Sequence, residues 1–211
     1  MTVQANGFLV VLSDVKTAHD RDYLAWLTTE HVQERLGIPG FLGVRIFSRP
    51  IEGGRQYFIW YQLANADIVD SPAYVERLNN PTPWSQRIMP ILGNFGRAGG
   101  KVKARKGDAA VFMMVAGLQN VPATPEHLDA LAAAPGIRSL HLFETDLKKT
   151  AVQTNERALR SSDHTFSGLL LLESDDQDAL TMTKFANRLD GMAVASSDGI
   201  HIYQQVFGLQ A

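Results

Sequence analysis

His31 is the residue of this 211-residue chain with the clearest potential for chemistry. It lies four residues after Leu27 and seven after Leu24 in a stretch, 20–36, that is predicted to be helical, so the three side chains share one face. That face should pack on a sheet, where an imidazole needs a hydrogen-bond partner, and Glu34 lies one turn away. A histidine in a semi-apolar cleft is the usual general acid or base. The alternative is a core histidine that a backbone carbonyl satisfies.

Arg45 is the second candidate. In the predicted strand 41–49, alternation places it on one face with Phe41 and Phe47, where an arginine needs an anionic partner or water. It could bind a carboxylate or enolate oxygen of a substrate, or form an ion pair with a helix glutamate, or face solvent. His141 occupies the equivalent position in the second half of the sequence, so this strand position is polar in both halves.

Aromatic residues surround these candidates in the sequence. We expect four of them to form a wall for a planar ligand: Tyr23, Trp26, Trp60 and Tyr61. The alternative is that they belong to the plain core, as aromatic residues at helical and strand spacing usually do. Trp84 follows Pro83 and would either close the mouth of a pocket or anchor a loop.

Several kinds of site are absent from the sequence. There is no cysteine, so disulfides, zinc thiolate sites and thiol nucleophiles are excluded. The histidines are scattered, with no HxH or HxxxH pair that would suggest a metal site. Neither a G-x-G-x-x-G nor a P-loop sequence occurs. We therefore expect no metal and no nucleotide cofactor.

The composition, 45% hydrophobic and 20% charged, is typical of a globular protein. A net charge of −2 argues against nucleic acid or an anionic membrane as a partner. The one basic run, 97–106, is interpreted as a solvated strand edge protected by lysines. No signal peptide or apolar run long enough to span a bilayer is present, so a cytoplasmic location is expected.

A pattern occurs twice, 96 positions apart: a histidine, then Pro39-Gly40 or Pro135-Gly136, then a strand-like run ending in phenylalanine. The histidines are His31 and His127, and the repeat predicts two copies of one unit, 1–106 and 107–211. His127 would lie in the first turn of a short helix, where exposure is expected, so the first unit is the expected location of the site.

The predicted elements follow the order βαββαβ in each unit. In the first unit we expect strands over 8–12, 41–49, 56–63 and 98–104 and helices over 20–36 and 66–80, with a helical segment over 84–92. The unbroken apolar run 8–12 predicts a strand that is buried on both faces. Asp20 is the expected N-cap of the first helix, and the second should start near Ser71-Pro72. In the second we expect strands over 109–118, 140–145, 166–173 and 200–207 and helices over 124–134 and 176–189. The polar segment 146–163 would be disordered or a functional lid. The predicted class is α+β, with two fused ferredoxin-like units packed by their bare sheet faces into a barrel.

The stretch Tyr23-x-x-Trp26-x-x-x-Glu30-His31, followed by Pro39-Gly40-Phe41 and a strand, resembles the opening of EthD-like members of the dimeric α/β-barrel superfamily. Asp70-Ser71-Pro72-Ala73-Tyr74 is similar to that superfamily as well. The resemblance covers the first half well and the second weakly. It implies a fold and a range of activities, among them cofactor-independent monooxygenases, lactone isomerases, aldoxime dehydratases and haem-handling enzymes.

We therefore expect a cofactor-independent enzyme acting on an aromatic, polyketide-like or unsaturated carboxylic compound. Its reaction would be proton-transfer chemistry or cofactor-free oxygenation, with His31 as base and Arg45 stabilising an oxyanion. The substrate would be bound by the aromatic residues named above, including Trp84, and by His141. The alternatives are an accessory protein that binds a small apolar ligand without catalysis, and a haem-binding protein with a histidine ligand. A homodimer is also compatible with the sequence.

Overall fold

The computed structural model describes residues 4–121, 125–160, 163–181 and 200–211. Within these ranges the strands are β1 (Gly7–Lys16), β2 (Phe41–Ile51), β3 (Gly54–Leu63), β4 (Gly93–Gly107), β5 (Phe112–Leu118), β6 (Ser139–Thr145), β7 (Gly168–Ser174) and β8 (Ile200–Gln210). The helices and helical turns are α1 (Thr17–Trp26), η1 (Leu27–His31), α2 (Val32–Leu36), η2 (Ala66–Asp70), α3 (Pro72–Asn79), α4 (Pro83–Ile88), η3 (Met89–Ile91), α5 (Pro125–Ala132), α6 (Leu147–Thr150), α7 (Asn155–Ala158) and η4 (Gln177–Leu180).

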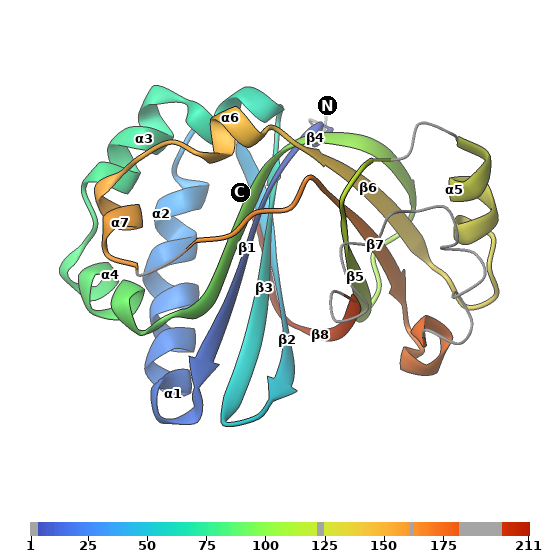
Figure 1. Ribbon diagram of the computed structural model, residues 1–211, viewed down its shortest axis with the longest axis horizontal. Coiled ribbons are helices and arrows are strands. Elements are labelled where there is room, and N and C mark those ends of the chain that lie inside the picture. The colour runs from blue at the N-terminus through green and yellow to red at the C-terminus, as the bar shows by residue number, and fades with distance from the viewer. Residues whose placement is uncertain (1–3, 122–124, 161–162, 182–199) are drawn as a thin grey trace.

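The strands close into one barrel in the order β1-β3-β2-β8-β5-β7-β6-β4, with every pair antiparallel. Helices α1 to α4 cover the barrel on the side of β1 and β3, and α5 covers it on the side of β6 and β7 (Figure 1). β4 is long enough to pair with β1 through its first part and with β6 through its second. The predicted edge at 97–106 is thus confirmed in part: the first residues of this run pair with β1, whereas residues 103–106 pair only with β6 and include the exposed Lys103, Arg105 and Lys106.

The two halves of the chain share a pairing scheme. β1 pairs with β3 and β4, while β5 pairs with β7 and β8; β2–β8 and β4–β6 pairs join the halves. This confirms the α+β class and the barrel, and the gene duplication stays a prediction. The side chain of His127 and most of the helix expected over 176–189 lie outside the described residues; of that helix the structure describes only η4.

β1 has one face toward the barrel interior and one toward the helices, as its unbroken apolar run predicted. In β1, Phe8 and Val10 enter the barrel interior and pack with Trp60. Leu9 and Val11 face the opposite way, into the core beneath α1 to α4. These two faces hold two separate sets of side chains, and no side chain of the strand contributes to both.

Two local predictions are wrong. The first helix begins at Thr17 rather than at Asp20, whose carboxylate accepts a hydrogen bond from the Tyr57 hydroxyl at 2.6 Å instead of capping the helix. Phe41 does not share a face with Arg45, because the register of β2 on β3 shifts between Phe41 and Gly43. The shift turns Phe41 toward the helices, where its ring meets Tyr61 at a centroid distance of 5.5 Å.

The start of α3 matches its prediction. Pro72 occupies the first turn, and the Ser71 hydroxyl accepts a hydrogen bond from the backbone N–H of Tyr74 at 3.4 Å. The helical segment predicted over 84–92 is also present, as α4 and η3. None of the described helices combines the length and the apolar character that a membrane crossing needs.

The described part of the segment, 146–160, leaves the second half and crosses over to the helices of the first half (Figure 1). Its short helices α6 and α7 lie against β4 and α3. After them, His164 exchanges backbone hydrogen bonds with β4, donating to the Phe95 carbonyl and accepting from the Arg97 N–H, each at 2.9 Å. The polar composition of this segment reflects its position on the surface, where it covers the cavity described below.

Candidate functional site

A π-helical turn, η1, interrupts the long helix between α1 and α2. In a regular α-helix, residues five apart point about 140° from each other around the axis. The extra residue in a π turn brings such a pair together. Here the rings of Trp26 and His31 are in contact, with centroids 4.3 Å apart. The sequence predicted a buried His31 but not this turn, and π turns are frequent at functional sites.

A cavity of about 110 Å³ lies between these helices and the helix-facing side of the sheet. His31 lines it, together with three of the predicted ring-binding residues, Tyr23, Trp26 and Tyr61. Aliphatic and aromatic side chains supply much of the remaining wall, among them Leu9, Val11, Ile59, Leu78, Met89 and Phe95. An apolar cavity of roughly 150 Å³ is known to hold benzene. The size of this cavity therefore suits a compound with one small ring.

The imidazole of His31 has no polar partner among the described residues. Its Nδ1 is buried and forms no hydrogen bond. Glu34, predicted as a partner, instead contacts Arg77 at 3.2 Å and Arg35 at 3.8 Å. Burial, and then the positive charges of Arg35, Arg160 and Arg77, hold the pKa of His31 well below its usual value of 6.5. The ring is therefore neutral at pH 7, with a nitrogen lone pair free to accept a proton.

Tyr61 provides a second polar atom without a partner at the same cavity. Its hydroxyl is buried and forms no hydrogen bond with a described residue. Burial raises the pKa of Tyr61 far above its usual value, and the positive charge of Arg35 opposes this only in part. The hydroxyl therefore stays protonated and can donate a hydrogen bond to an oxygen of a bound compound.

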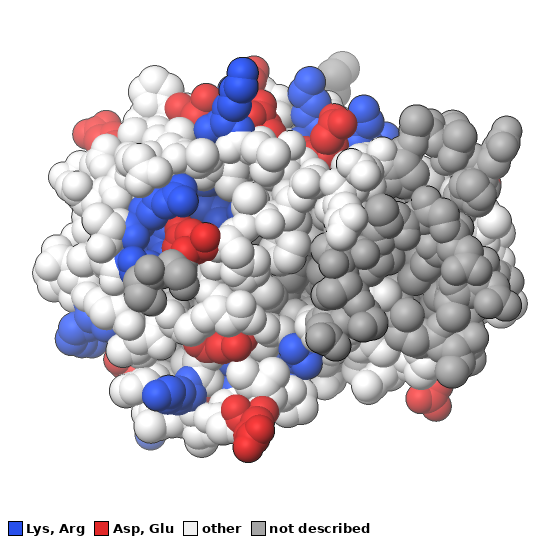
Figure 2. Space-filling model, in the orientation of Figure 1, with Lys and Arg blue, Asp and Glu red and all other residues white. Residues whose placement is uncertain are grey.

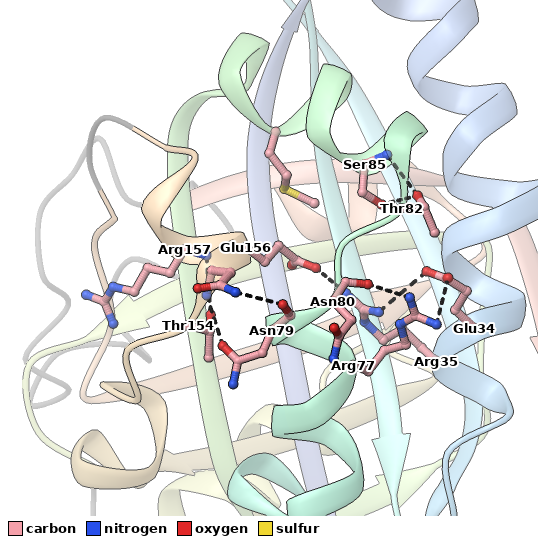
Figure 3. A network of polar contacts seen from close by, with 12 residues as sticks. Glu34, Arg35, Arg77, Asn79, Asn80, Thr82, Ser85, Thr154, Glu156 and Arg157 are labelled. Atoms are coloured by element: carbon pink, nitrogen blue, oxygen red, sulfur yellow. Dashed lines mark hydrogen bonds and ion pairs between the residues drawn. The ribbon is translucent and has the colours of Figure 1, made fainter.

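Residues between Leu147 and Arg160 line the cavity on its outer side. Figure 3 shows how polar contacts link Thr154, Glu156 and their neighbours to the helices of the first half. Glu156 of α7 receives a hydrogen bond from buried Arg35 of α2 at 2.6 Å. Asn155 bonds Asn79 at the end of α3, from its backbone N–H at 3.0 Å and from its side chain at 2.8 Å. Of the two interpretations of this segment, disordered or a lid, the described residues favour a cover held by a buried ion pair.

Arg45 and His141 lie in the barrel interior and not at this cavity. They meet at Glu173 of β7: the Arg45 guanidinium lies 2.8 Å and the His141 Nε2 3.4 Å from the carboxylate. Trp60 faces the same interior and contacts the His141 ring at a centroid distance of 4.7 Å. The expected pairing of His31 with Arg45 is absent, because helix and strand place them on opposite faces of one sheet. Trp60 likewise leaves the predicted aromatic wall, since it neighbours Tyr61 in β3 and points the other way.

Trp84 is half-buried outside the cavity and donates a hydrogen bond to the Asp22 carboxylate at 3.1 Å. Sequence reasoning missed Arg35, Arg97 and Glu156, which line the cavity. Arg35 follows His31 by four residues, a helical spacing that could have placed it on the same face. Nothing in the sequence indicated that Glu156 would reach the first half of the chain.

The cavity beside His31 does not fit a haem group. Drug-sized ligands fill pockets of roughly 300–1,000 Å³, and a tetrapyrrole needs space of that order. The cavity beside His31 has about 110 Å³, and residues between Leu147 and Arg160 cover part of its outer side. Among the described residues, no group of three or more histidine, aspartate or glutamate side chains is placed to hold a metal ion.

No family model matches the chain, and no curated protein matches it in sequence. Among solved structures, an anthrone oxidase-like protein aligns with a TM-score of 0.55 and 14% identity, covering 99% of this chain and 94% of that one. A chlorite dismutase-like protein aligns with a TM-score of 0.51 and 12% identity, covering 97% and 96%. A ferredoxin-fold protein related to antibiotic biosynthesis monooxygenases, from Listeria monocytogenes, has a TM-score of 0.42 and 12% identity, covering 97% of each chain.

The first two alignments show that the chain shares its fold with these structures over nearly its whole length. At such low identity they are informative about the fold and not about the reaction. The EthD-like resemblance stays a prediction.

Proposed function

We propose that the protein is a small-molecule enzyme in which His31 removes a proton from a compound with one small ring. The observation that carries this proposal is the neutral, buried imidazole of His31, which lines an apolar cavity and has no hydrogen-bond partner in the described chain. A buried polar group without a partner costs free energy, so its retention suits a role toward a ligand. The EthD-like resemblance and the anthrone oxidase-like neighbour are compatible with it.

The chemical step follows from the groups at the cavity. The imidazole accepts a proton from a C–H beside a carbonyl group or from a phenolic O–H, and the electron pair moves onto the substrate oxygen. The Tyr61 hydroxyl donates a hydrogen bond to that oxygen. Arginines near His31, which disfavour its protonation in the free protein, also favour the negative charge that develops on the substrate. Return of the proton to another carbon completes an isomerisation, whereas reaction of the carbanion with O₂ gives a cofactor-free oxygenation.

Deuterium exchange tests the first step without knowledge of the natural substrate. Small cyclic ketones, 1,3-dicarbonyl compounds and phenols are incubated with the protein in D₂O, and exchange at activated C–H positions is followed by proton NMR. We expect His31→Gln to lower the exchange rate by about 10²–10⁴, the usual contribution of a general base. His19→Gln is the matched control, because His19 lies in α1 but does not line the cavity.

A loss smaller than about tenfold in His31→Gln, with the far-UV circular dichroism unchanged, would contradict the role of His31 as base. An oxygen electrode distinguishes oxygenation from isomerisation for any compound that exchanges. Binding of these compounds with no exchange in the unaltered protein would favour the accessory, ligand-binding alternative.

A further inference from the structure

The cavity carries more positive than negative charge. Four arginines and two carboxylates line it, which leaves a surplus of two positive charges: Arg35, Arg97, Arg157, Arg160, Glu156 and Asp163. Arginine side chains gather at a hollow on the surface that carries α7 (Figure 2). A cleft with one dominant sign of charge attracts ligands of the opposite sign.

Three of the four arginines form ion pairs within the protein, two of them with the same carboxylate. Arg35 lies 2.6 Å from Glu156. Arg160 forms two hydrogen bonds with the carboxylate of Asp163, at 2.8 and 2.9 Å, and Arg157 lies 3.5 Å from the same carboxylate. These pairs hold the cover of the cavity in place, and they leave their arginines little capacity for a ligand.

Arg97 differs from the other three. Its Nη1 donates a hydrogen bond to the backbone carbonyl of Thr150 at 2.6 Å, and its guanidinium lies 5.7 Å from the ring centroid of Tyr74. Its Nη2 is buried and has no partner, and no carboxylate of the described residues comes within ion-pair distance. The guanidinium is thus fixed in position at the cavity with one N–H group unsatisfied. A guanidinium held in this way can donate a hydrogen bond to a negatively charged oxygen of a ligand.

We propose that the cavity binds its ligand as a monoanion, a small aromatic or branched carboxylate or an acidic phenol, with the anionic oxygen held by Arg97. The inference rests on the proposed function for the site and specifies the class of compound. The apolar walls accept the hydrocarbon part of the ligand. The fixed guanidinium and the surplus charge supply the partner of its oxygen, and the volume limits the ring to a small one.

Equilibrium binding of matched pairs of compounds tests this inference. Benzoate and benzamide have nearly the same shape and differ in charge, as do cyclopentanecarboxylate and its amide. Isothermal titration at pH 7.5 should give one site and an affinity for each acid roughly ten- to a hundredfold above that for its amide, the usual effect of a hydrogen bond to a charged group. Arg97→Met should remove this preference, while affinity for the amides stays within threefold, on the order of ordinary mutational scatter.

Arg87→Met is the matched control, because Arg87 lies on α4 with an exposed side chain outside the cavity and should keep the preference. The unaltered protein provides a test that does not depend on the folding of any variant. Equal affinities for acid and amide in both pairs, or no binding of either acid, would overturn the inference. So would an Arg97→Met protein that keeps the preference.

The test separates the inference from the proposed function. Titration requires no turnover, and His31→Gln should retain the preference for the acids. An anion preference that depends on Arg97, without any deuterium exchange, would support the binding site and contradict the role of His31. Exchange that depends on His31, without an anion preference, would support the role of His31 and contradict the anion site at Arg97.

Discussion

Two histidines are buried in the part of the chain that the structure describes, each in contact with a tryptophan, on opposite faces of the barrel wall. At the cavity, His31 contacts Trp26 at a centroid distance of 4.3 Å, and in the barrel interior His141 contacts Trp60 at 4.7 Å. The barrel histidine has a carboxylate, Glu173, at its Nε2. The cavity histidine has no polar partner among the described residues. The barrel histidine therefore has a charged partner at one ring nitrogen, although its Nδ1 is buried without one. The cavity histidine has no such partner, and this difference is the physical basis for assigning chemistry to the cavity.

The largest expected effect concerns the barrel. Glu173 has no exposed surface, contacts Arg45 at 2.8 Å and accepts a hydrogen bond from the backbone N–H of Ala110 at 3.0 Å. Glu173→Gln leaves the Arg45 charge buried without its partner. We expect it to lower the free energy of unfolding by about 3–5 kcal/mol. Urea unfolding measures this loss.

Two further variants sharpen that result. Combining Glu173→Gln with Arg45→Met should recover much of the stability, because no unpaired charge remains. Glu144→Gln removes an exposed partner of Lys103 and should cost less than about 1 kcal/mol. Equal losses in Glu173→Gln and Glu144→Gln would show that the barrel cluster is not a compensated ion pair.

The second prediction compares neighbouring residues of β3 that point to opposite faces. Tyr61→Phe removes only the hydroxyl that we assign to the substrate oxygen, so we expect the exchange rate to fall by about 10²–10³, as for an oxyanion donor. Trp60→Phe alters the barrel face and should leave the rate within about threefold, given its place in the other core. Similar losses in both variants would mean that the two faces are not functionally separate.

The third prediction uses pH. The pKa of His31 lies below 6.5 in the folded protein, so below this pH the unfolded state binds more protons than the folded state. Stability should therefore fall as the pH drops below 6.5, by at most about 1.4 kcal/mol per pH unit from this residue. His31→Leu should lose this part of the dependence while being at least as stable at pH 8. Urea unfolding at pH 5, 6.5 and 8 measures both, and an unchanged slope in His31→Leu would contradict the neutral, buried state of the ring.

The barrel cluster responds in a different pH range. Burial by itself would raise the pKa of Glu173, but hydrogen bonds from His141 and Arg45 and the Arg45 charge lower it from 4.5 to about 2. Its contribution is complete above pH 4.5 and is lost as the pH falls toward 2. The two regions thus contribute to the pH dependence of stability in ranges that can be separated.

Much of the fold could be predicted because short-range patterns control it. The apolar run in β1 predicted a strand buried on both faces, and Ser71-Pro72 predicted the start of α3. The site was predictable only in part. The helical phase of His31 with Leu27 predicts its place on the buried face, but simple alternation over 41–49 fails at Phe41 because of the register shift there. Trp60 and Tyr61 do not share one wall, because adjacent strand residues point to opposite faces.

The sequence by itself determined the order of strands and helices, the absence of thiol chemistry and the burial of His31, because these depend on residue types and on periods of two and 3.6 residues. Only the tertiary structure decided which polar residues meet. It brought Arg45 and His141 together at Glu173, from strands far apart in the chain, and it carried Glu156 across to Arg35. Such contacts depend on how a closed barrel joins its halves. No local sequence pattern specifies which residues meet when they lie far apart in the chain. The unpaired state of His31, Tyr61 and Arg97 at the cavity is of the same kind, since it depends on where the tertiary structure places each possible partner.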